Sequence, residues 1–144
     1  MDHAHRKCRC CRGLIFLGFE VQQNTTQLRT ESSYSVNEAL SMLNAGVYND
    51  GILADILERG EKNLSSLDPA ERRQFVAYQF DRINLAIHIQ SLEADGISDI
   101  HFPYVDFLIT QYQSKQGLQE FLVLIESEWA GSRELYDRLR KRDE

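Results

Sequence analysis

The sequence predicts an all-α protein, a single-domain helical bundle of about five helices that begins with a long helix. Three observations predict this class. Apolar residues recur every three or four positions through most of the chain, which places them on one face of a helix. Residues that start and stop helices separate these segments. The 144 residues, 42% hydrophobic and 26% charged, suffice for one globular domain with its own core.

The first helix covers at least the segment from Thr25 to Val47. Its apolar side chains form one stripe, and most polar side chains fall outside that stripe. The members of the stripe are Leu28, Val36, Leu40, Leu43 and Val47. If residues 14–21 continue this helix, it is the longest element of the chain.

The second helix is short and has marked ends. Asn49 or Asp50 can cap its start, because both side chains accept hydrogen bonds from the first free N–H groups. Gly60 follows ten residues later, where a left-handed residue would end the helix.

The third helix has the clearest start in the sequence. Asp68 stands at the N-cap, Pro69 at the first helical position and Glu71 at the third, from which a carboxylate can reach back to the cap. The helix continues to about Asp95 and Gly96, with an apolar arc too broad for a surface helix, so we expect it to be the central helix. The arc consists of Phe75, Val76, Tyr78, Phe80, Ile83, Leu85, Ala86, Ile87, Ile89 and Leu92.

Three shorter segments complete the predicted bundle. Pro103 fixes a turn, and residues 105–112 then have a helical spacing. Residues 118–129 continue the same pattern after Gly117. Ser132 can cap a last helix. The expected inward positions of that helix are Leu135 and Leu139.

The first twelve residues differ from the rest in charge. They contain four basic residues and one acidic residue, so the other 12 basic and 21 acidic residues leave a net charge of −9 on residues 13–144. An acidic body repels phosphate backbones, so we expect no nucleic-acid binding. We expect residues 1–12 to form a disordered basic Cys/His head and residues 13–144 to form the bundle domain.

All three cysteines lie in this head, so disulfides do not cross-link the body. The head contains four side chains of the types that ligate zinc, namely His3, His5, Cys8 and Cys11. Their single Cys-x-x-Cys spacing has no second ligand pair beyond it, so we predict no metal site and no cofactor. A second interpretation is acylation of the cysteines in a eukaryotic host.

Catalytic signatures are missing from the sequence: it contains no Gly-x-Ser-x-Gly, no Gly-rich phosphate loop, no His-Glu-x-x-His and no Glu-x-x-His pair. We therefore assign no catalytic residue. Asp81, Asn84 and His88 fall at spacings of three and four on the central helix. This polar stripe is either a ligand site or the exposed edge of the helix, and its exposure distinguishes the two.

Four aromatic residues in the last third of the chain have a similar ambiguity. They can line a pocket, but aromatic side chains at helical spacing usually pack in a core, so we assign them no role. They are Tyr104, Tyr112, Trp129 and Tyr136.

Residues 14–19, with the sequence LIFLGF, form an uncharged apolar run directly after the basic head. The run is too short to cross a bilayer, which needs about 20 apolar residues. Its flanks are typical of the inner end of a membrane anchor, and no small-residue cleavage site follows before Glu20. We expect residues 14–23 to be the remnant of an anchor, with Leu14 to Val21 in contact with lipid.

The stretch LIFLGFEVQQNTTQLR resembles the end of the N-terminal membrane helix in a widespread family of small bacterial proteins without an assigned activity. In that family the apolar segment runs into a QNT tripeptide, here Gln23, Asn24 and Thr25. Further likenesses are the helix start at Asn49 and Asp50 with its closing Gly60, the start at Leu67, Pro69, Glu71 and Arg72, and the later Gly96, Ile97 and Asp99. The resemblance covers most of residues 14–140 and implies a single-pass anchor beside a helical domain.

Upstream of Leu14 the chain departs from the family pattern, because a Cys/Arg/His segment replaces the apolar half of the anchor. We expect the authentic gene to encode a longer apolar N-terminus. The favoured function is a non-enzymatic domain, membrane-associated at the bacterial inner membrane, that acts through protein partners or as a homo-oligomer. The alternative is a soluble helical enzyme or small-ligand-binding module that uses Asp81, Asn84 and His88, and the chain is soluble if its N-terminus is authentic.

Overall fold

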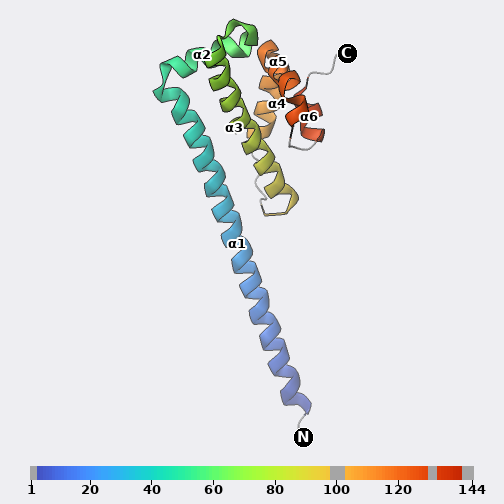
Figure 1. The fold of residues 1–144 in the computed structure, drawn as a ribbon. Coiled ribbons are helices and arrows are strands. Elements are labelled where there is room, and N and C mark those ends of the chain that lie inside the picture. Colours follow the sequence, from blue (N-terminus) through green and yellow to red (C-terminus); the bar gives the residue numbers. More distant parts are fainter. Residues whose placement is uncertain (1–2, 98–102, 130–132, 141–144) are drawn as a thin grey trace.

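The computed structural model describes residues 3–97, 103–129 and 133–140, with side chains described from Phe19 onward. In these ranges the chain forms six α-helices, two short 3-10 helices and no strand (Figure 1). They are α1 (His3–Asn49), α2 (Gly51–Lys62), η1 (Leu64–Ser66), α3 (Pro69–Ala94), α4 (Tyr104–Ser114), α5 (Gln116–Ile125), η2 (Glu126–Glu128) and α6 (Arg133–Leu139). The predicted all-α class and the long first helix are confirmed.

The helices pack around α3, which runs beside α1 and is joined to it through α2 (Figure 1). α4 packs against α3 and α5, α5 packs against α2, and α6 packs against α4. The N-terminal part of α1 projects well past the end of α3. We call residues 19–35 of α1 the arm and the assembly of α2, α3, α4 and α5 the body.

Two predicted helix starts are confirmed in atomic detail. The Asp50 carboxylate accepts hydrogen bonds from the backbone N–H groups of Ile52 and Leu53, at 3.0 and 3.1 Å. Asp68 and Glu71 form the predicted capping box, in which the Asp68 carboxylate accepts from the Glu71 N–H at 2.9 Å and Glu71 accepts from the Asp68 N–H at 3.0 Å. These bonds satisfy N–H groups that have no partner inside the helix.

The prediction that Gly60 ends α2 in a left-handed conformation is wrong, because α2 continues to Lys62 and Gly60 is buried within it. A Cβ atom at Gly60 would lie 2.4 Å from Cδ2 of Phe75, and one at Gly117 of α5 would lie 1.8 Å from the carbonyl oxygen of Gly60. Gly60 is therefore required by the packing of Phe75 of α3 against α2, and Gly117 by the close approach of α5 to the backbone of α2. Among the described residues, the glycine with a left-handed conformation is Gly96, with φ 66°, shortly after α3.

The core lies mainly inside the body, and the predicted central position of α3 is confirmed by its contacts with α1, α2 and α4. Phe121 of α5 receives three aromatic rings in edge-on geometry, with centroids 5.7 to 6.4 Å away. These rings belong to Phe75, Phe80 and Tyr112. Leu135 and Leu139 of α6 are fully buried, as predicted.

The predicted stripe of α1 holds for its C-terminal half only. Val36 is fully buried, and Leu40, Leu43 and Val47 are partly buried against the core. Leu28, the first member of the stripe, is 53% exposed and does not pack against the core. The partly buried position at this level is Arg29, and one residue along an α-helix turns the side chain by about 100°.

None of the helices in the described part of the chain is long and apolar enough to cross a membrane. The side chains of residues 3–18 lie outside the described residues. The backbone of residues 3–12 is part of α1, so it is helical where a disordered head was predicted. The anchor remnant and the zinc-ligand candidates His3, His5, Cys8 and Cys11 remain predictions.

Candidate functional site

The polar stripe of the sequence analysis faces outward. Asp81, Asn84 and His88 are all exposed on α3, and none of them lines either of the two hollows described below. Their environment is that of a solvated helix edge. Within the described residues, moreover, no three His, Cys, Asp or Glu side chains gather as a metal site requires.

The buried charge of α3 is Arg82, next to Asp81 in sequence but on the inward face and only 7% exposed. Its Nη1 donates to Oε1 of Gln79 at 3.3 Å and lies 3.6 Å from Oε1 of Glu61. The other carboxylate oxygen of Glu61 pairs with the Lys115 ammonium of the segment between α4 and α5. A buried charge is costly unless it is paired, and Glu61 supplies the partner.

Three tyrosines surround this charge. The Tyr112 hydroxyl donates to Oε1 of Gln79 at 3.0 Å, and the Tyr104 hydroxyl donates to the carbonyl oxygen of Arg82 at 3.3 Å. Burial raises the pKa of Tyr78, Tyr104 and Tyr112 above the ordinary value, although the nearby Arg82 charge opposes this. The three hydroxyls therefore remain neutral donors at physiological pH.

Gln79 is the other buried polar residue of α3, with an exposure of 0%. Its Oε1 accepts from both Arg82 and Tyr112, but its Nε2 has no hydrogen-bond partner in the described part of the chain. A buried donor without a partner costs about 1–3 kcal/mol. We call Glu61, Tyr78, Gln79, Arg82, Tyr104 and Tyr112 the polar cluster.

A cleft of about 330 Å³ opens onto this cluster between α1 and the helices α2, α3 and α4. Its apolar wall consists of Leu40, Leu43 and Val47 of α1 together with Ala54, Leu57 and Phe107, and its polar groups belong to Asn44, Glu58, Glu61, Tyr78, Arg82, Tyr104 and Gln111. The volume is at the lower end of the range of about 300–1,000 Å³ typical of small-molecule sites. We call this hollow the Arg82 cleft.

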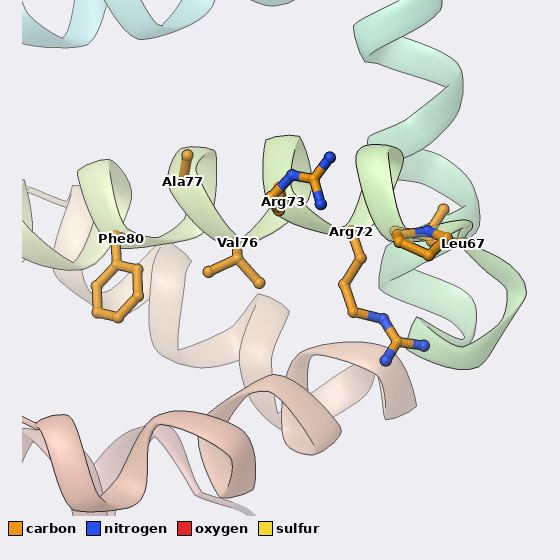
Figure 2. Close-up of a pocket in the computed structure, with 7 residues that line it drawn as sticks. Leu67, Arg72, Arg73, Val76, Ala77 and Phe80 are labelled. Carbon is orange, nitrogen blue, oxygen red and sulfur yellow. The ribbon is translucent and has the colours of Figure 1, made fainter.

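A second hollow, of about 570 Å³, lies along the opposite face of α3. It is lined by Leu67, Pro69, Arg72, Arg73, Val76, Ala77 and Phe80. Figure 2 shows Arg72, Val76 and Phe80 projecting from one side of α3, with Arg73 and Ala77 on the other side. Its floor is apolar, and Phe80 packs edge-on against Phe121 beneath it. We call this hollow the α3 groove.

The four aromatic residues without an assigned role divide between core and cleft. Tyr112 and Tyr136 are fully buried, and Trp129 packs edge-on against Tyr136 with the ring centroids 5.1 Å apart. Only Tyr104 of the four lines the Arg82 cleft.

The sequence analysis missed the polar cluster although the sequence contains a signal for it. Gln79 and Arg82 share a spacing of three and four residues with Phe75, Ala86 and Ile89, all of which are buried. A polar side chain in phase with the apolar arc is the mark of a buried polar group. The predicted polar stripe instead consists of residues of α3 that lie outside the arc, namely Asp81, Asn84 and His88.

Comparisons of the chain with known protein families, with curated proteins and with solved structures find no match. The resemblance to the bacterial family with the QNT tripeptide therefore stays a prediction.

Proposed function

We propose that this chain is a non-enzymatic helical domain that acts by binding a protein partner in the α3 groove. The observation that supports this most directly is an open apolar surface with two arginines beside it. Val76 and Phe80 are only partly buried and Ala77 is exposed, although all three line the groove. Exposed apolar surface with a polar rim is typical of interaction sites.

The charges beside the groove indicate the chemistry of the partner. The chain has a net charge of −6, yet the charged residues that line the groove are Arg72 and Arg73. Arg72 donates to the carbonyl oxygen of Leu64 at 3.3 Å, which holds it at the end of the groove. Arg73 is exposed and makes no hydrogen bond or ion pair within the described residues. An acidic partner complements this local excess of positive charge.

The length of the groove fits a short helix. From Arg72 to Phe80 is eight residues, or about 12 Å and two turns of α3. An amphipathic helix that places apolar residues at positions i, i+3, i+4 and i+7 presents a stripe of that length. The proposed partner is therefore an amphipathic segment with apolar anchors and acidic flanks.

Membrane association belongs to the same proposal. The apolar run of Leu14 to Val21 supports it on the sequence side, and Phe19 and Val21 are 63% and 64% exposed. The projection of α1 past the bundle also keeps this end away from the α3 groove (Figure 1). Lipid contact of this segment leaves the groove open to a partner. We expect the full chain to sediment with anionic lipid vesicles. We expect this binding to be lost when Phe19 and Val21 are changed to Ser.

The docking proposal can be tested with a pair of labelled peptides. Both carry Leu at the four anchor positions, and the remaining positions are Glu-rich in one peptide and Lys-rich in the other. Fluorescence anisotropy with the full chain should give at least tenfold tighter binding of the acidic peptide, corresponding to about 1.4 kcal/mol. The double variant Arg72→Glu and Arg73→Glu should reverse that preference, while Met42→Asp on the exposed face of α1 should not change it.

Equal affinity for the two peptides, or a preference that survives the charge reversal, would contradict the docking proposal. So would the absence of binding by either peptide. Light scattering tests whether a second copy of the chain occupies the groove instead. A homodimer that dissociates in the Val76→Asp variant but not in the matched control Met42→Asp would show this, and it would overturn the proposed partner.

A further inference from the structure

The polar cluster beneath the Arg82 cleft has more hydrogen-bond donors than acceptors. Arg82 has five N–H donors; its Nη1 contacts Gln79 and Glu61, and its side chain also forms a hydrogen bond with the Tyr104 hydroxyl. The Tyr78 hydroxyl makes no hydrogen bond within the described residues, and Nε2 of Gln79 has no partner there. Within the polar cluster, the carboxylate and amide acceptors are the carboxylate of Glu61 and the Oε1 of Gln79. A ligand rich in acceptors would balance this set.

The charges around Glu61, at the inner end of the cleft, have the same bias. Glu61 lies between two cations, Arg82 at 3.6 Å, which lines the cleft, and Lys115 in direct contact, which does not line it. The three side chains together have a net charge of +1. The nearby Glu58 is paired with Lys62 at 2.6 Å. A single negative charge on a ligand would neutralise the inner part of the cleft, and the planar guanidinium is well suited to a carboxylate.

The walls of the cleft restrict the rest of the ligand. Leu40, Leu43 and Val47 of α1 and the ring of Phe107 on α4 all line the hollow. Such walls favour an apolar body, since burial of apolar surface is the main source of affinity in small-molecule sites. The volume of about 330 Å³ equals roughly eleven water molecules at about 30 Å³ each, so the body is small.

We propose that the Arg82 cleft binds a small organic monocarboxylate with an apolar body. The carboxylate accepts hydrogen bonds from the Arg82 guanidinium and from the Tyr78 hydroxyl, which lie one helical turn apart on the same face of α3. The apolar body lies between α1 and Phe107. This site is separate from the α3 groove, so each proposal can fail without the other.

Calorimetric titration of the full chain with hexanoate and with benzoate tests this inference. The controls are hexanamide and benzamide, which have the same shape without the charge, at matched ionic strength. Saturable binding of the carboxylates with at least tenfold weaker binding of the amides is expected. Equal binding of acids and amides, or no saturation up to about 10 mM carboxylate, would overturn the proposal.

Variants locate the binding in the cleft. Tyr78→Phe removes one hydroxyl without changing the volume and should weaken carboxylate binding roughly tenfold, whereas Tyr48→Phe, at a position 86% exposed on α1, should leave it unchanged. Ala54→Leu fills the cleft and should abolish binding. Arg82→Lys should weaken carboxylate binding most. If this substitution unfolds the chain, Tyr78→Phe and Ala54→Leu still test whether the ligand lies in the cleft. Equal affinities of the Tyr78→Phe and Tyr48→Phe proteins, or full binding by Ala54→Leu, would place the ligand elsewhere and contradict the proposal.

Discussion

The arm and the body are both helical, but only the body has a core. No side chain of residues 19–35 is buried, and many of its contacts are local. Hydroxyls of the arm donate to carbonyl oxygens four residues earlier, as Thr25 does to Val21 at 2.8 Å and Ser32 to Leu28 at 2.8 Å. In the body, Phe75, Leu118 and Phe121 are fully buried. Packing stabilises helices more than such local bonds do, so the stability of the chain resides in the body.

Arm and body also differ in their relation to the two proposed binding sites. Both hollows lie on α3, where a rigid core supports the side chains that line them. The Arg82 cleft takes one wall from α1, at the end where α1 is packed against the body. The arm beyond this end contributes to neither hollow. Substitutions in the body should therefore affect folding, and substitutions in the arm should affect it little.

The largest expected effect is the loss of the ring at the centre of the body. Phe121→Ala should lower the free energy of unfolding by about 3–5 kcal/mol, because three aromatic neighbours lose their packing partner. Leu28→Ala in the arm should change it by less than about 0.5 kcal/mol. Urea denaturation measures both. Similar losses in the two variants would abolish the distinction between arm and body.

The close contact of α2 with α5 gives the next largest effect. Gly117→Ala should destabilise the chain by about 1–3 kcal/mol or more, because its methyl group would overlap the backbone of Gly60. Gly46→Ala in α1 meets no atom within 4 Å and should stabilise the chain by about 0.5–1 kcal/mol. If Gly117→Ala were as stable as the natural chain, α2 and α5 could not approach as closely as described.

A smaller effect depends on pH. Two hydrogen bonds from Arg59, at 2.7 and 3.1 Å, and one from the Asp68 N–H lower the pKa of Glu71 below its ordinary value of 4.5. A lowered native pKa gives stability that is present above pH 4.5 and is lost as pH falls through the native value. Because the pair is partly exposed, Glu71→Gln should lower the free energy of unfolding only slightly at pH 7.

The same variant should make the chain less sensitive to acid. Urea titrations at pH 7 and pH 3 should show a smaller loss of stability for Glu71→Gln than for the natural chain. Glu31→Gln serves as the control in the arm, where Glu31 accepts from Gln27 at the exposed surface. An unchanged acid response in Glu71→Gln would show that the Arg59 pair does not act on stability in this range.

The smallest expected effect is that of shortening the chain. A protein that starts at Asn24 should retain cooperative melting, with a midpoint within about 3 °C of the full chain, since the side chains of residues 19–23 are exposed. Circular dichroism during heating measures it. Loss of the cooperative transition would show that the removed segment belongs to the core.

Sequence patterns predicted the parts of the fold that depend on local chemistry. The Asp50 cap, the Asp68 and Glu71 capping box and the end of α3 near Gly96 were all predicted, because caps and left-handed residues act within a few positions. Gly60 was assigned wrongly because the reason for a glycine there is the ring of Phe75, 15 positions later and in contact only after folding. Leu28 does not pack against the core because the face of α1 that meets α3 is set by packing between helices.

The candidate site was less predictable than the fold. The polar residues Asp81, Asn84 and His88 were recognised by their spacing, yet a sequence does not show which side of α3 is covered. Arg82 and Gln79 lie on the covered side. The walls of the cleft come from α1, α2 and α4, and their assembly depends on contacts between residues far apart in the chain.

Hydrogen exchange, resolved by residue in the full chain at neutral pH, tests the separation of arm and body most directly. The account predicts that amides of α2, α3 and α5 exchange only through global unfolding, with protection that corresponds to the full free energy of unfolding. Amides of residues 19–35 should exchange through local opening, orders of magnitude faster. Equal protection in the arm and in the body would contradict the account, because it would mean that the arm is part of the cooperative core.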